Sequence, residues 1–137
     1  MPRDISFHAW GEQFFPSRIN FVFSEAHDTD MVGTWGRIKN QPANYGSAII
    51  RIPSNIPNEE RIAYLVKTVH PIMPDILKAG ATECYLDIGR YYSKQCNEEL
   101  SAKHLALISS LNCDLRYSAY HVSEAEESEM QAILENI

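Results

Sequence analysis

Hydrophobic and polar residues alternate along four stretches of the chain, and a period of two is typical of a β-strand with one buried side. In DISFHAW, Ile5, Phe7 and Ala9 fall on one side of the expected strand, whereas Ser6 and His8 fall on the other. The other three stretches are residues 45–53, 81–92 and 113–122. The pattern therefore predicts a sheet built from these four strands.

Each of these strands is predicted to turn one side toward a hydrophobic core. The inward-facing residues are Ala48, Ile50 and Ile52 in the second strand, Cys84, Leu86 and Ile88 in the third, and Leu115, Tyr117 and Ala119 in the fourth. The other side of the third strand carries Glu83, Tyr85 and Asp87. Such one-sided strands are typical of a sheet that helices cover on one face.

A different period begins at Asn58, where apolar residues start to recur at intervals of three and four, as on one stripe of an amphipathic helix. Asn58 is expected to cap this helix. Pro71 and Pro74 each remove an amide donor, so a kink or break is predicted near His70. Gly80 is expected to end the segment in a left-handed conformation. The stripe comprises Ile62, Leu65, Val66, Val69, Ile72, Met73, Ile76 and Leu77.

Two further helices are predicted in the second half of the chain. The first begins near Ser101. Its apolar positions are Leu105, Ile108 and Leu111. The second covers about residues 124–136, and Ser123 with Glu126 has the spacing of a capping box at its start.

Residues 17–23 fit two kinds of structure. Ile19, Phe21 and Phe23 alternate as in a strand, whereas Pro16 is a favourable first residue for a short helix. Enrichment in aromatic residues favours the strand.

Strands interleaved with helices predict an α+β fold, a two-layer sandwich in which helices pack on one face of a mixed, mostly antiparallel sheet. No repeat, linker or low-complexity tract divides the chain, so residues 1–137 are expected to form a single domain.

Composition narrows the classes of function. The net charge of −6 argues against a surface that binds nucleic acid, which requires lysine and arginine. No apolar run approaches the roughly 18 residues of a membrane span, and the first residues lack the apolar run of a signal peptide, so a cytoplasmic protein with no membrane partner is predicted. Three cysteines without a C-x-x-C pair indicate free thiols.

The segment SEAHDTDMVG, residues 24–33, brings His27, Asp28 and Asp30 close together in sequence. Imidazole and carboxylate groups can ligate a metal ion. Adjacent side chains of an extended segment point to opposite sides, however, and the run 26–45 is rich in turn-forming residues. We therefore expect a solvated acidic loop, with no bound metal and no cofactor.

An alternative hypothesis is a small hydrolase or metal-dependent enzyme that uses His8, His27 or His121 with nearby carboxylates. His8 and His121 fall on the two terminal strands, and their imidazoles would converge if those strands were neighbours. Cys84 and Cys113 fall in strand patterns and are expected to be inert thiols against the core. We assign no catalytic residue.

The opening FHAWGEQFFPSRI and the later segments ECYLDIGRYY and LSAKHLALISSLNCDLRYSAY occur in an order that resembles a known family. This is a group of small bacterial domains catalogued as domain-of-unknown-function family four-two-seven-nine. The residues that carry the resemblance in the last segment are Leu100, Ser101, Leu105, Leu111, Asp114 and Tyr120. Because such domains are often encoded beside toxins of competition between bacteria, the resemblance implies an immunity or adaptor role and a strand-first α+β fold.

The leading hypothesis from the sequence is a non-enzymatic binding protein, an immunity protein that covers the active site of a cognate bacterial toxin. Negative charge would steer such a protein to a basic cleft, and aromatic residues would supply contact area. The residues expected to contact the toxin are Asp28, Asp30, Trp35, Glu98 and Glu99. A further hypothesis is a homodimer that pairs through an exposed sheet face.

Overall fold

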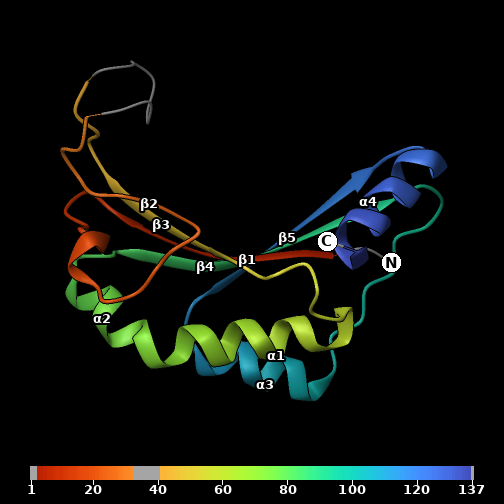
Figure 1. The fold of residues 1–137 in the computed structure, drawn as a ribbon. Coiled ribbons are helices and arrows are strands. Elements are labelled where there is room, and N and C mark those ends of the chain that lie inside the picture. The colour runs from red at the N-terminus through yellow and green to blue at the C-terminus, as the bar shows by residue number, and fades with distance from the viewer. Residues whose placement is uncertain (1–2, 33–40, 137) are drawn as a thin grey trace.

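A computed structural model describes residues 3–32 and 41–136, and Figure 1 shows its fold. The strands are β1 (Arg3–Gly11), β2 (Glu25–His27), β3 (Gly46–Arg51), β4 (Glu83–Tyr92) and β5 (Asp114–His121). The α-helices are α1 (Asn58–Val69), α2 (Met73–Lys78), α3 (Ala102–Ser110) and α4 (Glu124–Asn136). Two short 3-10 helices cover Pro16–Arg18 and His70–Ile72.

The strands form one sheet in the order β2-β3-β1-β4-β5. All neighbouring pairs are antiparallel except β4 and β5, which run parallel. Parallel neighbours need a long crossover, and α3 lies in the connection that provides it. The predicted α+β fold with a mixed sheet is therefore confirmed.

The core lies between the sheet and α1. Phe7 pairs in register with Leu86 on one neighbouring strand and with Ile50 on the other, and all three side chains are buried on the same face. From α1, Leu65 and Val69 close this layer with no exposed surface. The alternation of buried and accessible residues thus gives the sheet one covered face and one open face.

The helices are divided between the two faces. Figure 1 shows α1, α2 and α3 below the sheet and α4 above it, where β4 and β5 end. The α4 helix starts with the predicted capping box, because Ser123 Oγ accepts a hydrogen bond from the backbone N–H of Glu126 at 3.1 Å. Ser93, just after β4, bonds to Glu127 of α4. The α4 helix therefore borders the open face at one end.

Of the two structures that fitted residues 17–23, the short helix that starts at Pro16 forms and the favoured strand does not. Pro16–Arg18 forms a 3-10 helix, and the chain after it is irregular up to β2. A strand needs a neighbour, and the place beside β3 is taken by β2 instead. Phe21 and Phe23 pack edge-to-face with ring centroids 5.0 Å apart, so their apolar surface meets the core without strand pairing. The three-residue strand β2 opens the run that the sequence predicted to be a loop.

The helix from Asn58 breaks as predicted at His70, where the prolines follow. Gly80 has φ +110°, which confirms its left-handed conformation. Asn58 is not the cap, however, because it is the first helical residue and Pro57 holds the N-cap position. Pro57 cannot supply a side-chain oxygen, and its backbone carbonyl accepts from Glu60 N–H at 2.9 Å.

The last strand, β5, is less buried than its pattern predicted. Leu115 and Tyr117 point to the covered side, yet they keep 38% and 41% of their surface exposed. The reason is that β5 is the edge strand and α3 packs against α1 rather than over β5. Leu105 of α3 is 50% exposed for the same reason. Over residues 3–32 and 41–136, no helix has the length and apolar character needed to cross a bilayer.

Candidate functional site

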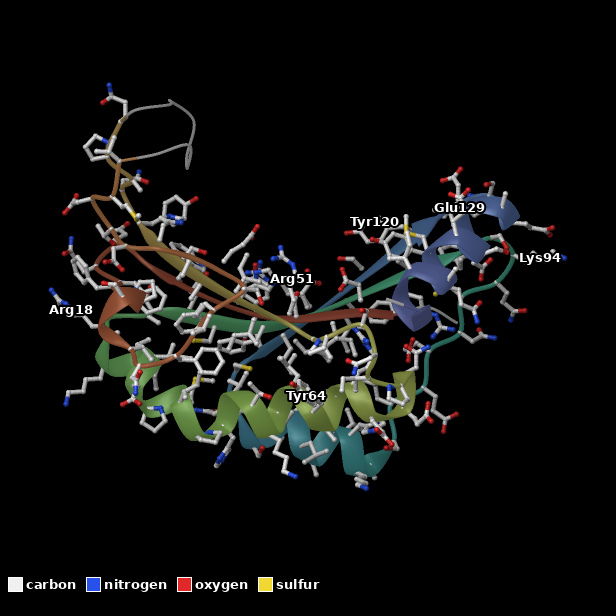
Figure 2. The ribbon with its side chains drawn as sticks, viewed as in Figure 1. Arg18, Arg51, Tyr64, Lys94, Tyr120 and Glu129 are labelled. Atoms are coloured by element: carbon white, nitrogen blue, oxygen red, sulfur yellow. The ribbon has the colours of Figure 1, made fainter. Side chains whose placement is uncertain are left out.

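The open face of the sheet carries the side chains that alternate with the core. On β1 these are Ser6, His8 and Trp10, and on β4 they include Tyr85 and Asp87. Figure 2 shows Arg51 on this face and Tyr120 beside α4, whereas Tyr64 lies on α1 below the sheet. The face is curved, since both of its ends rise toward the side that carries α4 (Figure 1). Polar and aromatic groups from several strands are thus displayed side by side.

His8, Tyr85 and Arg116 form a stack across β1, β4 and β5. The rings of His8 and Tyr85 are nearly parallel, at 4° between planes, with centroids 4.8 Å apart. The guanidinium carbon of Arg116 lies 3.7 Å from the centroid of the Tyr85 ring. Because His8 and Arg116 belong to the two strands that flank β4, they hold Tyr85 from both sides. Such contacts fix the orientation of the side chains before any ligand arrives.

Ser6 and neighbouring charged residues extend this surface. Ser6 Oγ and His8 Nε2 lie 2.8 Å apart, and Ser6 faces Asp87 across the β1–β4 pair. On the β3 side, Arg51 Nη2 donates to Glu25 Oε2 at 3.1 Å. The surface therefore presents both signs of charge rather than a continuous basic strip.

The His8 imidazole is neutral near neutral pH. Its burial lowers its pKa from the ordinary 6.5. Asp87 opposes this shift, whereas the cationic Arg51 and Arg116 add to it. The pKa of His8 is therefore lowered overall, and the stack with Tyr85 forms with an uncharged ring.

A pocket of about 320 Å³ lies at the Trp10 end of the open face. Its lining residues are His8, Ala9, Trp10, Tyr45, Ser47 and Tyr85. The rings of Trp10 and Tyr45 meet at 86° with centroids 6.4 Å apart, so they form a corner. Behind Tyr45, the ring of His27 lies 5.1 Å away at 74°. The Tyr45 ring of this corner is thus in contact with a buried side chain.

His27 itself is a packed residue. It belongs to β2 and is only 7% exposed, which differs from the solvated loop that the sequence predicted. Burial lowers its pKa, although the backbone of Tyr45 and the charge of Asp28 oppose the shift.

Of the five residues predicted to contact a toxin, the four that the structure describes do not form one surface. Asp28 binds the backbone N–H of Ser17 at 2.9 Å and also its hydroxyl, so it holds the 3-10 helix in place. Asp30 is exposed with φ 69°. Trp35 lies outside the described residues. Glu98 and Glu99 lie in the connection between β4 and α3, whereas Asp28 and Asp30 follow β2. Figure 1 shows these two segments at opposite ends of the molecule.

Glu98 is largely removed from solvent, which its sequence context did not predict. Its side chain is 13% exposed and pairs with Arg90, whose side chain is 7% exposed. The hydroxyl of Tyr117 donates to the same carboxylate at 3.3 Å. Glu98 therefore joins β4, β5 and the loop before α3, whereas Glu99 is exposed.

The histidines named in the enzyme hypothesis lie apart. His8 faces Tyr85, but His121 faces Tyr92, seven residues further along β4, which corresponds to about 23 Å at the rise of a strand. His27 is separated from β1 by β3. Within residues 3–32 and 41–136, no three histidine, cysteine, aspartate or glutamate side chains are grouped so that they could hold a metal ion.

The thiols of Cys84 and Cys113 pack against the core, as predicted. Burial raises the pKa of Cys84 to about 11, and it also raises the pKa of Cys113. Both groups are thus protonated and poorly nucleophilic at neutral pH.

Trp10, Tyr85 and Arg116 were not among the predicted site residues. A signal for the first two was present, because each is an aromatic residue on the polar side of a strand. The stack and the pocket depend on strand order, which alternation does not reveal.

Comparison with known proteins adds no relative, since no family model, no curated protein and no solved structure matches the chain. The resemblance noted from the sequence stays a prediction.

Proposed function

We propose that this chain is a non-enzymatic binding protein that neutralises a cognate protein toxin, and that it docks through the open face of its sheet. The single observation that carries the docking surface is the His8–Tyr85–Arg116 stack, which preorganises side chains of three strands on an uncovered face. Preorganised aromatic and arginine side chains are what protein interfaces use as anchors.

The chemistry of the open face favours a protein partner over a nucleic acid. Arg51 is already paired with Glu25, and Asp87 lies in register with Arg116. A surface that follows phosphates would instead need several cations of one sign. The net charge of −6 points the same way.

The same face is poorly suited to catalysis. Ser6 and His8 resemble a nucleophile and its base, at 2.8 Å. However, acyl transfer also needs donors that stabilise an oxyanion, and the backbone N–H groups in the middle of a sheet bond to neighbouring strands. This supports binding as the role of the Ser6–His8 pair.

The toxin enters the proposal through the resemblance to the four-two-seven-nine domain family, not through the geometry. The acidic charge of the chain supports it, because an acidic inhibitor associates rapidly with a basic active-site cleft. Asp30 and Glu99, both exposed, are available to contribute to this steering.

The test is a growth assay in a bacterial host. The protein encoded by the adjacent reading frame is expressed alone, with this chain, and with the variant Tyr85→Ser/Arg116→Ser. We expect inhibition of growth by the neighbour alone, rescue by this chain and loss of rescue in the variant. Lys67→Ser is the matched control, because Lys67 is an exposed cation on α1, on the other side of the sheet.

Two results would contradict the proposal. If the neighbouring protein does not inhibit growth, it is not a toxin, and the proposed partner is wrong. Rescue by the open-face variant that equals rescue by Lys67→Ser would show that the docking surface lies elsewhere.

A further inference from the structure

The pocket at Trp10 differs from the rest of the open face in its charge. Trp10 is in register with Glu83 across the β1–β4 pair, so both side chains leave the sheet on the same face, and Glu83 is exposed. Glu12, also exposed, follows directly after β1. Within residues 3–32 and 41–136, the charged groups that neighbour this end of β1 in sequence or register are therefore acidic.

Neither of the two arginines described on the open face, Arg51 and Arg116, is among the residues that line the pocket. Arg51 is in register with Ser6, four residues before Trp10, which corresponds to about 13 Å along the strand. Arg116 approaches Tyr85 from the β5 side, so the Tyr85 ring stands between its guanidinium and the pocket.

The two imidazoles near the pocket do not add positive charge at neutral pH. Burial lowers the pKa of both His8 and His27. The pocket consequently combines aromatic walls, a neighbouring carboxylate and uncharged histidines.

We infer that this pocket binds an arginine side chain of the partner protein, an inference that rests on the proposed function and names the partner group that this part of the site receives. The guanidinium stacks on the indole of Trp10 and turns its edge toward Tyr45, since the two rings meet at 86°. From that position it donates to the carboxylate of Glu83. The pocket volume of about 320 Å³ accommodates a single long side chain.

Arginine fits this geometry better than lysine. A guanidinium is planar, stacks on aromatic faces and donates in two parallel bonds to a carboxylate. An ammonium is a compact and strongly hydrated charge, which gains less from a flat aromatic wall. A basic partner is also the one that an acidic chain of net charge −6 attracts.

The experiment is an NMR titration of the isotope-labelled full chain with the blocked tripeptide Gly-Arg-Gly. The same tripeptide with citrulline in place of arginine is the matched probe, because citrulline has nearly the same shape but no charge. The indole N–H resonance of Trp10, assigned with the variant Trp10→Phe, reports on the pocket. We expect it to shift saturably with the arginine peptide and about 3- to 10-fold more weakly with the citrulline peptide.

Two variants test whether the Glu83 carboxylate supplies the charge that binds the arginine peptide. Glu83→Gln is expected to weaken the binding of the arginine peptide about 3-fold and to leave the affinity for the citrulline peptide unchanged. Glu59→Gln, at an exposed carboxylate in the first turn of α1, is the control and should change neither.

The inference is overturned if the Trp10 resonance does not shift, or if both peptides shift it with equal affinity. This failure is separable from that of the proposed function. If growth rescue depends on Tyr85 and Arg116 while the peptides fail to bind, the docking surface stands and the arginine pocket is wrong. If the arginine peptide binds but the neighbouring protein is not a toxin, the pocket stands and the proposed function is wrong.

Discussion

Adjacent residues of β1 meet two different environments. Phe7 is completely buried against α1, whereas His8 lies on the open face in contact with Tyr85. On the covered face, side chains are held by close packing and the removal of apolar surface from water. On the open face, they are held by stacking and hydrogen bonds that contribute much less to stability. The two faces of one strand therefore hold their side chains in place by different kinds of interaction.

The same contrast applies along β4, where Leu86 and Ile88 are buried and Tyr85 and Asp87 are accessible. An open face that served only solubility would carry scattered charged groups. This one carries a stack of ordered rings and a corner formed by Trp10 and Tyr45. Under the proposed function, this preorganisation would lower the entropic cost of binding a partner.

The largest expected effect is the difference in unfolding free energy between variants at Phe7 and at His8. Phe7→Ala should lower the free energy of unfolding by about 3–5 kcal/mol, because it leaves a cavity in the core. His8→Ala should lower it by only about 1 kcal/mol, the value of one stacking contact. Urea denaturation followed by circular dichroism measures both. Equal losses would show that the open face is as important to stability as the core.

The next effect is a difference in stability between variants of two acidic residues, both of which the sequence predicted to contact a partner. Glu98→Gln should cost about 2–3 kcal/mol of unfolding free energy, because it leaves the buried Arg90 without its counter-charge. Asp30→Asn is the matched control and should change stability by no more than about 0.5 kcal/mol. Asparagine also tolerates the positive φ of this position.

The measurement for this pair is again the urea midpoint of each purified variant. If Glu98→Gln were as stable as Asp30→Asn, the Arg90–Glu98 pair would not be part of the structural framework, and Glu98 would return to the set of partner-binding candidates.

The smallest effect is a pH dependence that arises at the open face. Since burial lowers the pKa of folded His8 below 6.5, the unfolded chain binds more protons than the folded chain in the range just below that value. Stability is therefore fully present above about pH 7.5 and falls as the pH drops through 6.5 toward the folded pKa.

His8→Gln should flatten this dependence between about pH 7.5 and about pH 5.5, as read from urea midpoints. His27 has a pKa lowered in the same direction, so part of the slope should persist until His27→Gln is added. An unchanged slope in the double variant would assign the pH dependence to other groups.

Most of the fold follows from patterns that are local in sequence. The alternation around Phe7 and Leu86 and the stripe around Leu65 each identify an element and its buried side, because packing against a core imposes the period. The break at His70 follows from the chemistry of the prolines next to it.

Other features depend on contacts between distant residues. A strand of three residues such as β2 is too short to show a period, and it forms because β3 offers a free edge. The exposure of Leu115 follows from the position of β5 at the sheet edge. Alternation predicts which side a residue faces but not whether a helix covers that side.

The candidate site was predicted least well for the same reason. Glu98 lies in a polar segment, SKQCNEE, and only the neighbouring Arg90 and Tyr117 largely remove it from solvent. Arg116 and His8 are 108 positions apart in the chain and meet only because β4 lies between their strands. Strand order was the missing information in both cases.

Under the proposed function, the open face serves partner binding and contributes little to folding. The most direct test measures two quantities for the variant Trp10→Ala/Tyr85→Ala, the free energy of unfolding and the rescue of growth from the neighbouring toxin. We predict a loss of stability within about 2 kcal/mol, as expected for two aromatic contacts, together with complete loss of rescue. Full rescue by this folded variant would contradict the claim.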